Sequence, residues 1–185
     1  MNDFLAGILD RSAIQEVGIA DLLGRRVVPP KKDLMLAAVK GKNILITGAA
    51  GTIGSELCDT ILIHDPLSVI LLDHSEIGLY NLQKHLEKKS GSRKKIIFLL
   101  GSIMDQNYLE SVISKFQIHK VYHAAAYKHV HLVEENIISG VRNNVLGTMN
   151  LVNSIRRSSV EELVLISSDK AVHPTNVMGA TKRLA

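Results

Sequence analysis

The most chemically suggestive segment of this sequence is a glycine-rich turn at residues 47–54, TGAAGTIG. Its glycines have the spacing G-x-x-G-x-x-G, directly after an apolar run and directly before a helical pattern. In such a turn Gly48 allows the tight bend, Gly51 admits a pyrophosphate close to the backbone, and Gly54 packs the helix against the strand. The helix N-terminus offers free N–H groups to phosphate oxygens. Because the Gly-Lys-Ser/Thr of a P-loop is absent, the turn favours a dinucleotide, the alternative being an ordinary glycine-rich connection.

Two further segments fit a dinucleotide. Asp73 ends the next apolar run, where an acid can hydrogen-bond both ribose hydroxyls of the adenosine half and repel a 2′-phosphate. His74 rather than Arg follows it, so NAD is favoured over NADP; the alternative role for Asp73 is a helix N-cap. Residues 101–105 (GSIMD) follow the third apolar run, where an adenine pocket would lie. The cofactor-binding residues predicted from these segments are Gly48, Ala50, Gly51, Thr52, Ile53, Gly54, Asp73, Ser102 and Ile103.

An acid and an amine stand side by side after the fifth apolar run, in Ser168, Asp169 and Lys170. In an open α/β sheet, ligands bind beyond the carboxyl ends of the strands. An adjacent carboxyl and amine there can donate and accept protons for one substrate. The alternative is a surface ion pair with an N-cap. Met178 and Lys182 follow at a spacing of four, which places them on one face of the next helix.

Alternating strands and helices must position these residues. Short apolar runs rich in β-branched residues occur at 43–47, 68–73, 95–100, 120–123 and 163–167. Such runs are typical of strands buried on both faces of a parallel sheet. Helical patterns lie between them, at 55–64, 77–89, 106–116 and 141–158, with a short helix near 132–136. We therefore predict an α/β fold with a doubly wound parallel sheet, of the Rossmann type, over residues 42–185.

Residues 1–41 are less regular, and we assign them to an N-terminal arm. The arm contains a helical turn at 21–24, a basic connector with two prolines, and a short helix at 34–40. Asp33 is the expected cap of that helix, and Gly41 follows its end. At the other terminus the last residues lack a helix stop signal, so we expect the domain to be incomplete before its substrate-binding part.

The composition excludes several classes of protein. The 185 residues carry 22 Lys+Arg against 18 Asp+Glu, and 46% are hydrophobic, which supports a folded core and not disorder. The single cysteine, Cys58, excludes a disulfide framework, and we predict it to be buried and inert. His123, His129 and His131 lack the Cys or clustered carboxylates of a metal site. No apolar run is long enough for a membrane span, no secretory signal is present, and no basic stripe indicates nucleic acid.

Five segments together resemble the extended short-chain dehydrogenase/reductase family. They are residues 47–54, 123–130 (HAAAYKHV), 143–148 (NNVLGT), 168–171 (SDKA) and 174–182 (PTNVMGATK). More narrowly, they resemble the UDP-N-acetylglucosamine 4,6-dehydratases of bacterial glycan biosynthesis, the CapD-like polysaccharide biosynthesis proteins. The resemblance covers the chain from about residue 19, and residues 21–25 (DLLGR) resemble the segment that precedes the catalytic domain in the long, membrane-anchored branch.

The resemblance implies a redox-neutral elimination on a UDP-sugar. Bound NAD would take a hydride from C4, the resulting ketone would acidify the C5 proton, and the hydride would return to C6. Lys170 would remove the C5 proton, and Asp169 would protonate the departing C6 hydroxyl. Lys182 would bind the nicotinamide ribose. The alanines that would form a wall beside the cofactor are Ala124, Ala125 and Ala126.

The wider superfamily has a Tyr-x-x-x-Lys pair, and Met178 stands in the place of its tyrosine. The long branch resembles this sequence in having methionine there. A thioether cannot accept a proton, so we expect Ser168, Asp169 or a water that they hold to take the O4 proton. The alternative for Met178 is a packing role.

The resemblance also implies roles for residues around the site and for the partners of the protein. Lys128 and His129 would shape the sugar or phosphate pocket, while Asn143 and Asn144 would orient loops near the cofactor or cap a helix. Glu134 and Glu135 are interpreted as a solvated helix start. The expected partners are a UDP-sugar and a second copy of the chain, in the cytoplasm or at the cytoplasmic face of the inner membrane. Two competing functions stay open, a UDP-sugar 4-epimerase and a dinucleotide-binding module without turnover.

Overall fold

The computed structural model describes residues 28–89 and 95–185, and the chain divides into two compact units, 1–32 and 33–185. The turn expected at 21–24 lies outside the described residues. The division falls nine residues before the boundary expected at 41. Helix α2 (Lys32–Val39) explains the difference, because Val39 is buried in the core of the second unit. The helix starts at Lys32, so Asp33 lies in its first turn and the prediction that it caps the helix is wrong.

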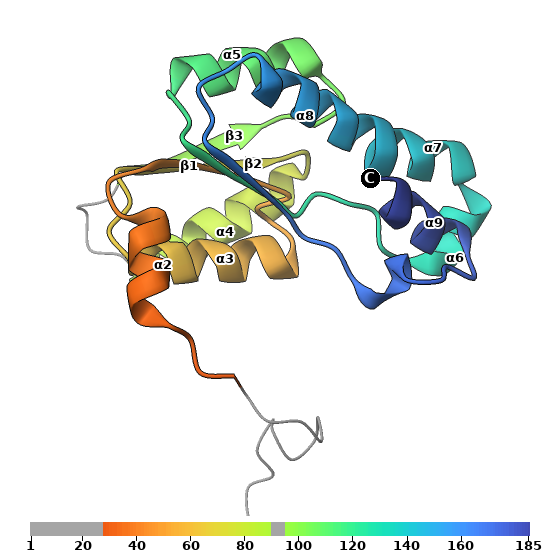
Figure 1. Cartoon of the computed structure of the whole chain (residues 1–185), viewed down its shortest axis with the longest axis horizontal. Helices are drawn as coiled ribbons and strands as arrows, with labels where there is room; N and C mark the ends of the chain where they lie inside the picture. The colour runs from red at the N-terminus through yellow and green to blue at the C-terminus, as the bar shows by residue number, and fades with distance from the viewer. Residues whose placement is uncertain (1–27, 90–94) are drawn as a thin grey trace, which may run out of the picture. The chain divides into compact units, whose positions relative to one another are not determined.

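The second unit is built on a parallel sheet of five strands in the order β3-β2-β1-β4-β5 (Figure 1). The strands are β1 (Asn43–Thr47), β2 (Ser68–Asp73), β3 (Lys95–Leu100), β4 (Lys120–His123) and β5 (Glu162–Leu165). The first four have the predicted bounds. Strand β5 ends two residues early, because β4, with which it pairs, ends at His123, the partner of Leu165. The predicted doubly wound sheet is confirmed.

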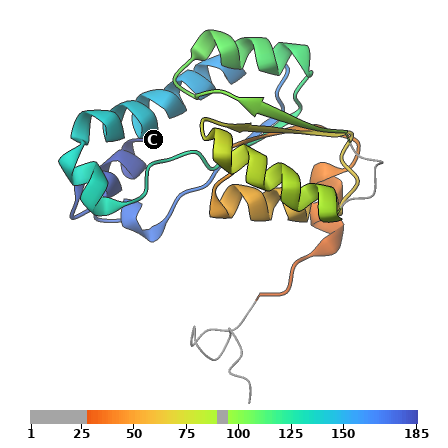
Figure 2. The ribbon, with the colours of Figure 1, turned by 180° about the vertical axis from the view of Figure 1, so that it is seen from behind.

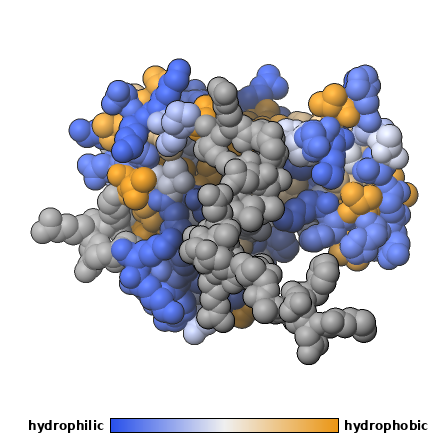
Figure 3. Space-filling model, turned by 90° about the horizontal axis from the view of Figure 1, so that it is seen from below, coloured by the Kyte–Doolittle hydropathy of each residue, from blue (hydrophilic) through white to orange (hydrophobic). Residues whose placement is uncertain are grey.

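Helices cover both faces of the sheet (Figures 1 and 2). Alternate residues of β1 point to opposite faces. Ile44 and Ile46 join the core under α3 (Thr52–Leu62) and α4 (Glu76–Lys89), whereas Leu45 joins the core under α5 (Gln106–Lys115) and α8 (Gly147–Arg156). The central strands β1 and β2 are therefore buried along their whole length. Where Figure 3 shows the described surface, hydrophilic residues predominate and hydrophobic ones are scattered among them.

The helices follow the predicted order, with two departures, a short helix at 137–141 that was not predicted and a π-helical turn within the helix predicted at 141–158. The bounds are α3 (Thr52–Leu62), α4 (Glu76–Lys89), α5 (Gln106–Lys115), α6 (Val130–Glu135), α7 (Ile137–Val141), α8 (Gly147–Arg156) and α9 (Val177–Leu184). The helix predicted at 141–158 contains a π-helical turn, Arg142–Leu146, between α7 and α8. Such turns disturb helical packing and occur often at functional sites. In the described part of the chain, no helix is both long and apolar enough to cross a membrane.

Candidate functional site

A cavity of about 230 Å³ lies at the carboxyl ends of the strands. Strand β1 is the point from which the strand order runs in opposite directions, and open α/β sheets bind ligands at this switch point. Four loops, one after each of the strands β1 to β4, form the walls, and the π-helical turn adds Asn143. The lining residues are Gly48, Ala50, Gly51, Leu72, Asp73, His74, Ser75, Gly101, Ser102, Ile103, Ala124, Ala125, Ala126, Tyr127 and Asn143.

The glycine turn has the geometry that its spacing predicts. Gly48 adopts a φ of +68°, and a Cβ on it would lie 2.5 Å from the backbone nitrogen of Ala125. A Cβ on Gly54 would collide with the carbonyl oxygen of Gly48, which confirms that Gly54 is needed for close packing. Gly51 is the N-cap of α3, and a Cβ on it would lie 3.3 Å from the carbonyl oxygen of Gly48. No side chain caps this helix end, so its first N–H groups have no side-chain partner.

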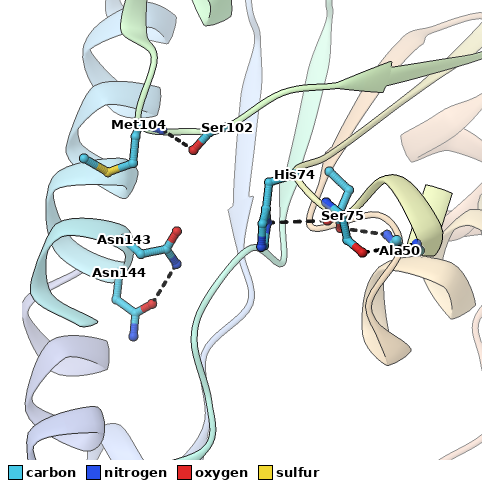
Figure 4. Close-up of polar contacts among 9 residues, drawn as sticks. Ala50, His74, Ser75, Ser102, Met104, Asn143 and Asn144 are labelled. Atoms are coloured by element: carbon cyan, nitrogen blue, oxygen red, sulfur yellow. Dashed lines mark hydrogen bonds and ion pairs between the residues drawn. The ribbon is translucent and has the colours of Figure 1, made fainter. Parts of the chain in front are cut away.

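Asp73 fastens this turn to the segment after β2. The side chain is 7% exposed, and its two oxygens accept hydrogen bonds from the backbone nitrogens of Ala50 (3.0 Å) and Ser75 (2.9 Å) (Figure 4). The alternative that Asp73 caps helix α4 is wrong, because the Ser75 hydroxyl accepts the bond from Gly78. His74 is exposed, and its Nδ1 lies 3.5 Å from Asp73 Oδ1.

The other predicted cofactor residues divide into two groups. Those in the loops after β3 and β4 line the cavity, namely Ser102, Ile103, Ala124, Ala125 and Ala126. Thr52, Ile53 and Gly54 do not line it, since Thr52 and Ile53 are exposed in the first turn of α3 and Gly54 is buried against Gly48.

Ser168, Asp169 and Lys170 lie beyond the carboxyl end of β5, as predicted, but the structure does not bring them into the cavity. Asp169 and Lys170 belong to a 3₁₀ turn, Asp169–Ala171. The side chains are 90% and 53% exposed, and Lys170 Nζ lies 3.6 Å from Asp169 Oδ1. The acid and the amine are therefore neighbours on an open surface.

Helix α9 carries Met178 and Lys182 in different environments. Met178 is 2% exposed, which favours the packing interpretation over contact with a substrate. Lys182 is half-buried, and its Nζ donates a hydrogen bond to the Ile166 carbonyl at 3.3 Å, just beyond β5. Burial lowers the pKa of this ammonium. Lys182 does not line the cavity either.

Asn144 links the cavity wall to helix α9. Its Oδ1 accepts a bond from the backbone nitrogen of Tyr127 at 2.7 Å, and its Nδ2 donates to the Tyr127 carbonyl at 2.9 Å. Nδ2 also donates to Thr181 Oγ1 at 2.9 Å. The structure thus agrees with the loop-orienting role for this asparagine. Asn143, which lines the cavity, donates to Asn144 (Figure 4).

His123 was not among the residues singled out as functional, yet it is the centre of a buried polar cluster. It is 1% exposed, and its two ring nitrogens contact the hydroxyls of Thr47 (2.6 Å) and Thr148 (2.9 Å). Burial and the charge of Lys182 lower the pKa of the imidazole to about 4. In the sequence, the position of a histidine at a strand end was its only signal.

Glu134 and Glu135 are exposed, as expected, but they end helix α6 and do not start a helix. Glu134 Oε1 also accepts a bond from the Val177 backbone nitrogen at the start of α9. A second cavity, of about 390 Å³, adjoins the loop after β4 and includes Lys128 and His129 with mostly apolar neighbours. Among the residues that the structure describes, no three His, Cys, Asp or Glu side chains are grouped to hold a metal ion.

Comparison with known proteins gives a consistent family. Residues 44–185 match the family described as "Polysaccharide biosynthesis protein". The chain is 41% identical over 185 residues to the capsular polysaccharide biosynthesis protein CapD of Staphylococcus aureus, covering all of this chain and 31% of that protein. It is 29% identical to a UDP-N-acetylglucosamine 4,6-dehydratase (inverting) of Campylobacter jejuni, and 30% identical to a UDP-glucose 4-epimerase of Rickettsia bellii. Each of these two matches covers 77% of this chain and 41% of the relative.

Among solved structures, the X-ray structure of Pen from Bacillus thuringiensis superposes with a TM-score of 0.73 at 34% identity. The superposition covers 78% of this chain and 44% of Pen. The chain therefore spans less than half the length of the proteins that it resembles.

Proposed function

The chain belongs to the polysaccharide biosynthesis protein family, and from that premise we propose that it serves as a nucleotide-sugar 4,6-dehydratase that uses NAD and acts on UDP-N-acetylglucosamine. The observation that carries the proposal is the cavity at the switch point of the sheet, with a sterically required glycine turn on one side and an alanine wall on the other. Support for the substrate comes from the Campylobacter jejuni relative.

The described residues fit a dinucleotide. The positions where a Cβ would collide, Gly48 and Gly54, keep the backbone open beside the uncapped start of α3, where a pyrophosphate would lie. Asp73 would hold the adenosine ribose, and Ser102 and Ile103 would border the adenine. When bound, the nicotinamide supplies a hydride acceptor and donor for the sugar. Asp73 must share its carboxylate with the backbone of Ala50, so its charge is partly satisfied before any ribose binds.

Proton transfer would fall to the pair beyond β5. Lys170 in its neutral form would take the C5 proton of the sugar, and Asp169 in its acid form would protonate the C6 hydroxyl, which leaves as water. Their separation of 3.6 Å allows both to reach one substrate from the same side. Since Met178 is buried and has no proton to exchange, the O4 proton would pass to Ser168, Asp169 or a water between them.

Two observations keep other functions in view. The relative named UDP-glucose 4-epimerase is as similar as the dehydratase, and an epimerase shares the 4-keto sugar but needs no acid at C6. The exposure of Asp169 and Lys170, outside the cavity, would suit a dinucleotide-binding module without turnover.

The test is to incubate the protein with NAD and UDP-N-acetylglucosamine and to follow the sugar by mass spectrometry. A dehydratase yields a product that has lost one water and absorbs in alkali as a 4-keto sugar. An epimerase yields a product of unchanged mass. A protein that binds NAD but yields neither product would match a binding module or a chain that lacks its substrate-binding part. Asp169→Asn should abolish the dehydration, whereas Lys88→Met, which removes an exposed lysine at the end of α4, should leave it unchanged. Full turnover by Asp169→Asn would refute the proton assignment.

Pairing of two copies is also part of the proposal. Large apolar side chains are exposed along α7 and α8, among them Ile138 (74%) and Met149 (50%). Burying them against a second copy would remove apolar surface from water. Sedimentation of the protein and of an Ile138→Glu, Met149→Glu variant would test this, since a dimer should become a monomer.

A further inference from the structure

We propose that His123 is a positioning residue that, as a neutral imidazole with its hydrogen on Nε2, fixes the glycine turn against the alanine wall and so sets the affinity for the dinucleotide. The expected effect on dinucleotide affinity rests on the proposed function. The hydrogen-bond arrangement around His123 depends only on contacts within the chain.

The contacts of His123 join three elements. Thr47 and His123 are the last residues of β1 and β4, and they stand opposite each other in the register of these parallel strands. Thr47 Oγ1 lies 2.6 Å from His123 Nδ1, and Thr148 Oγ1, on helix α8, lies 2.9 Å from His123 Nε2. All three side chains are at most 4% exposed. Water is therefore not available to replace either bond.

The hydroxyl of Thr148 fixes the position of the ring hydrogen. That hydroxyl donates its one hydrogen to the carbonyl oxygen of Asn144 at 2.7 Å, within the π-helical turn. Its oxygen can then only accept from the ring, so Nε2 carries a hydrogen. A neutral imidazole has one N–H, which leaves Nδ1 as an acceptor for the hydroxyl of Thr47. Hydrogen bonds thus run in one direction, from Thr47 through His123 and Thr148 to Asn144.

The surroundings hold the ring neutral. His123 is buried, and the charged group that acts on it is the ammonium of Lys182, which also repels a proton from the ring. A second hydrogen, on Nδ1, would meet the hydroxyl of Thr47 and turn it from a donor into an acceptor. The one-directional chain of bonds therefore exists only in the neutral form.

The hydrogen bonds of His123 to Thr47 and Thr148 act on the cavity through the residues that follow Thr47 and His123. The carbonyl oxygen of Thr47 accepts the backbone N–H of Ala124 at 3.0 Å, directly after His123. The next residues of the two segments, Gly48 and Ala125, are so close that a Cβ on Gly48 would lie 2.5 Å from the Ala125 nitrogen. Both residues line the cavity. A loosened Thr47–His123 pair would therefore shift the two walls between which the dinucleotide must fit.

Two substitutions separate the two bonds of the ring. In His123→Asn, the amide oxygen can occupy the place of Nδ1 and accept from Thr47, while the bond to Thr148 is lost. In His123→Gln, the amide nitrogen can occupy the place of Nε2 and donate to Thr148, while the bond to Thr47 is lost. Asparagine is one methylene shorter than glutamine and leaves the larger cavity, so a packing effect alone would harm His123→Asn more, which is the reverse of the order expected from the hydrogen bonds.

The measurements are the NAD affinity by titration calorimetry, at a temperature where denaturation curves show each variant folded, and the exchange rate of the Ala124 amide hydrogen. We expect His123→Asn to bind within about twofold of the wild type, and His123→Gln to bind about tenfold more weakly. The Ala124 amide should exchange faster in His123→Gln than in His123→Asn. Equal affinities and equal exchange rates in the two variants would overturn the proposal. If neither variant folds, Thr47→Val against Thr47→Ser makes the same comparison from the other partner.

A third measurement does not depend on the proposed function. Nitrogen-15 NMR of the unliganded protein should show one imidazole with Nε2 protonated and Nδ1 unprotonated, and with no titration between pH 5 and 8. A hydrogen on Nδ1 would refute the assignment. The spectrum and the Ala124 exchange can agree with the proposed hydrogen bonds of His123 while the wild type binds no NAD. In that case the proposed function fails and the positioning role of His123 in the turn stands.

Discussion

The backbone nitrogen of Val177, the first residue of helix α9, lies 2.6 Å from Oε1 of Glu134, a residue 43 positions earlier on α6. Asn176 caps the same helix end, because its Oδ1 accepts the backbone N–H of Gly179 at 2.8 Å. The first turn of α9 is therefore satisfied by one local and one distant side chain. The carboxylate also lies at the positive end of the helix dipole. Glu134 thus fixes the start of the helix that carries Lys182.

Replacing Glu134 should loosen α9 without unfolding the sheet. For Glu134→Ala we expect a loss of about 1 kcal/mol in the free energy of unfolding, as for the removal of a helix cap. Glu134→Gln should lose less, since an amide oxygen can still accept the bond. Urea denaturation and exchange of the Val177 amide hydrogen measure the two effects. Glu135→Ala, at the exposed neighbouring position, is the control. The same small change at both positions would contradict the capping role.

Two glycines with almost the same backbone angle provide a test of the close approach at the cavity. Gly41 has a φ of +69° and no atom within 4 Å of an added Cβ, whereas Gly48 has a φ of +68° and the backbone of Ala125 at 2.5 Å. Gly41→Ala should cost about 1–2 kcal/mol, from backbone strain alone. Gly48→Ala should cost about 1–3 kcal/mol more, from overpacking, and should also weaken NAD binding.

Urea denaturation of both variants and calorimetric titration with NAD give the comparison. Because the strain in φ is common to the two positions, the difference in unfolding free energy isolates the contact with Ala125. Equal losses at Gly41 and Gly48 would show that the alanine wall can move away at no cost.

The fold could be predicted because its signals are local. Strands buried on both faces are continuous apolar runs, so β1 and β2 had the right bounds, and the alternation with helices determined the sheet. The glycine spacing likewise predicts positions without room for a side chain, and the collisions of an added Cβ at Gly48 and Gly54 confirm this. Even the end of β5 was missed only because it depends on the length of its neighbour.

The parts that could not be predicted depend on contacts between distant residues. The hydrogen bond that the Val177 N–H donates to Glu134 joins segments 43 positions apart, and no sequence pattern around Glu134 predicts it. The π-helical turn contains Asn144, which bonds to both Tyr127 and Thr181, and the sequence of the turn is ordinary for a helix. For the same reason, the order of residues along the chain could not show that Asp169 and Lys170 lie outside the cavity.

Cys58 should behave as a protected thiol. It is fully buried in α3, and burial together with the nearby charge of Asp59 raises the pKa of the thiol to about 12. Because the thiolate is the reactive form, a thiol-specific reagent at pH 8 should not modify the folded protein. Modification should appear only as urea unfolds the chain, and at the same midpoint as the loss of helical signal. Rapid labelling without urea would contradict the burial. Since this is the chain's one cysteine, the readout has a single source.

Acid should destabilise the protein through His123 in a defined range of pH. The pKa of the imidazole is about 4 in the folded chain, against 6.5 for an unperturbed histidine, because of burial and the charge of Lys182. Between these values the unfolded chain binds a proton that the folded chain does not, so the free energy of unfolding falls as the pH falls from about 6.5 to about 4. Below pH 4 both states are protonated, and this contribution stays constant.

The shift corresponds to about 3 kcal/mol lost over that range. The measurement is urea denaturation of the wild type and of His123→Asn at a series of pH values. Carboxyl groups titrate in both proteins and cancel in the difference, including Glu161, whose pKa the hydrogen bond from Lys42 lowers. The difference in unfolding free energy between the two proteins should therefore shrink as the pH falls from 6.5 to 4 and should be flat above pH 7. A difference that does not change with pH would mean that the imidazole titrates alike in the folded and unfolded chains, and one that grows as the pH falls would mean that folding raises its pKa.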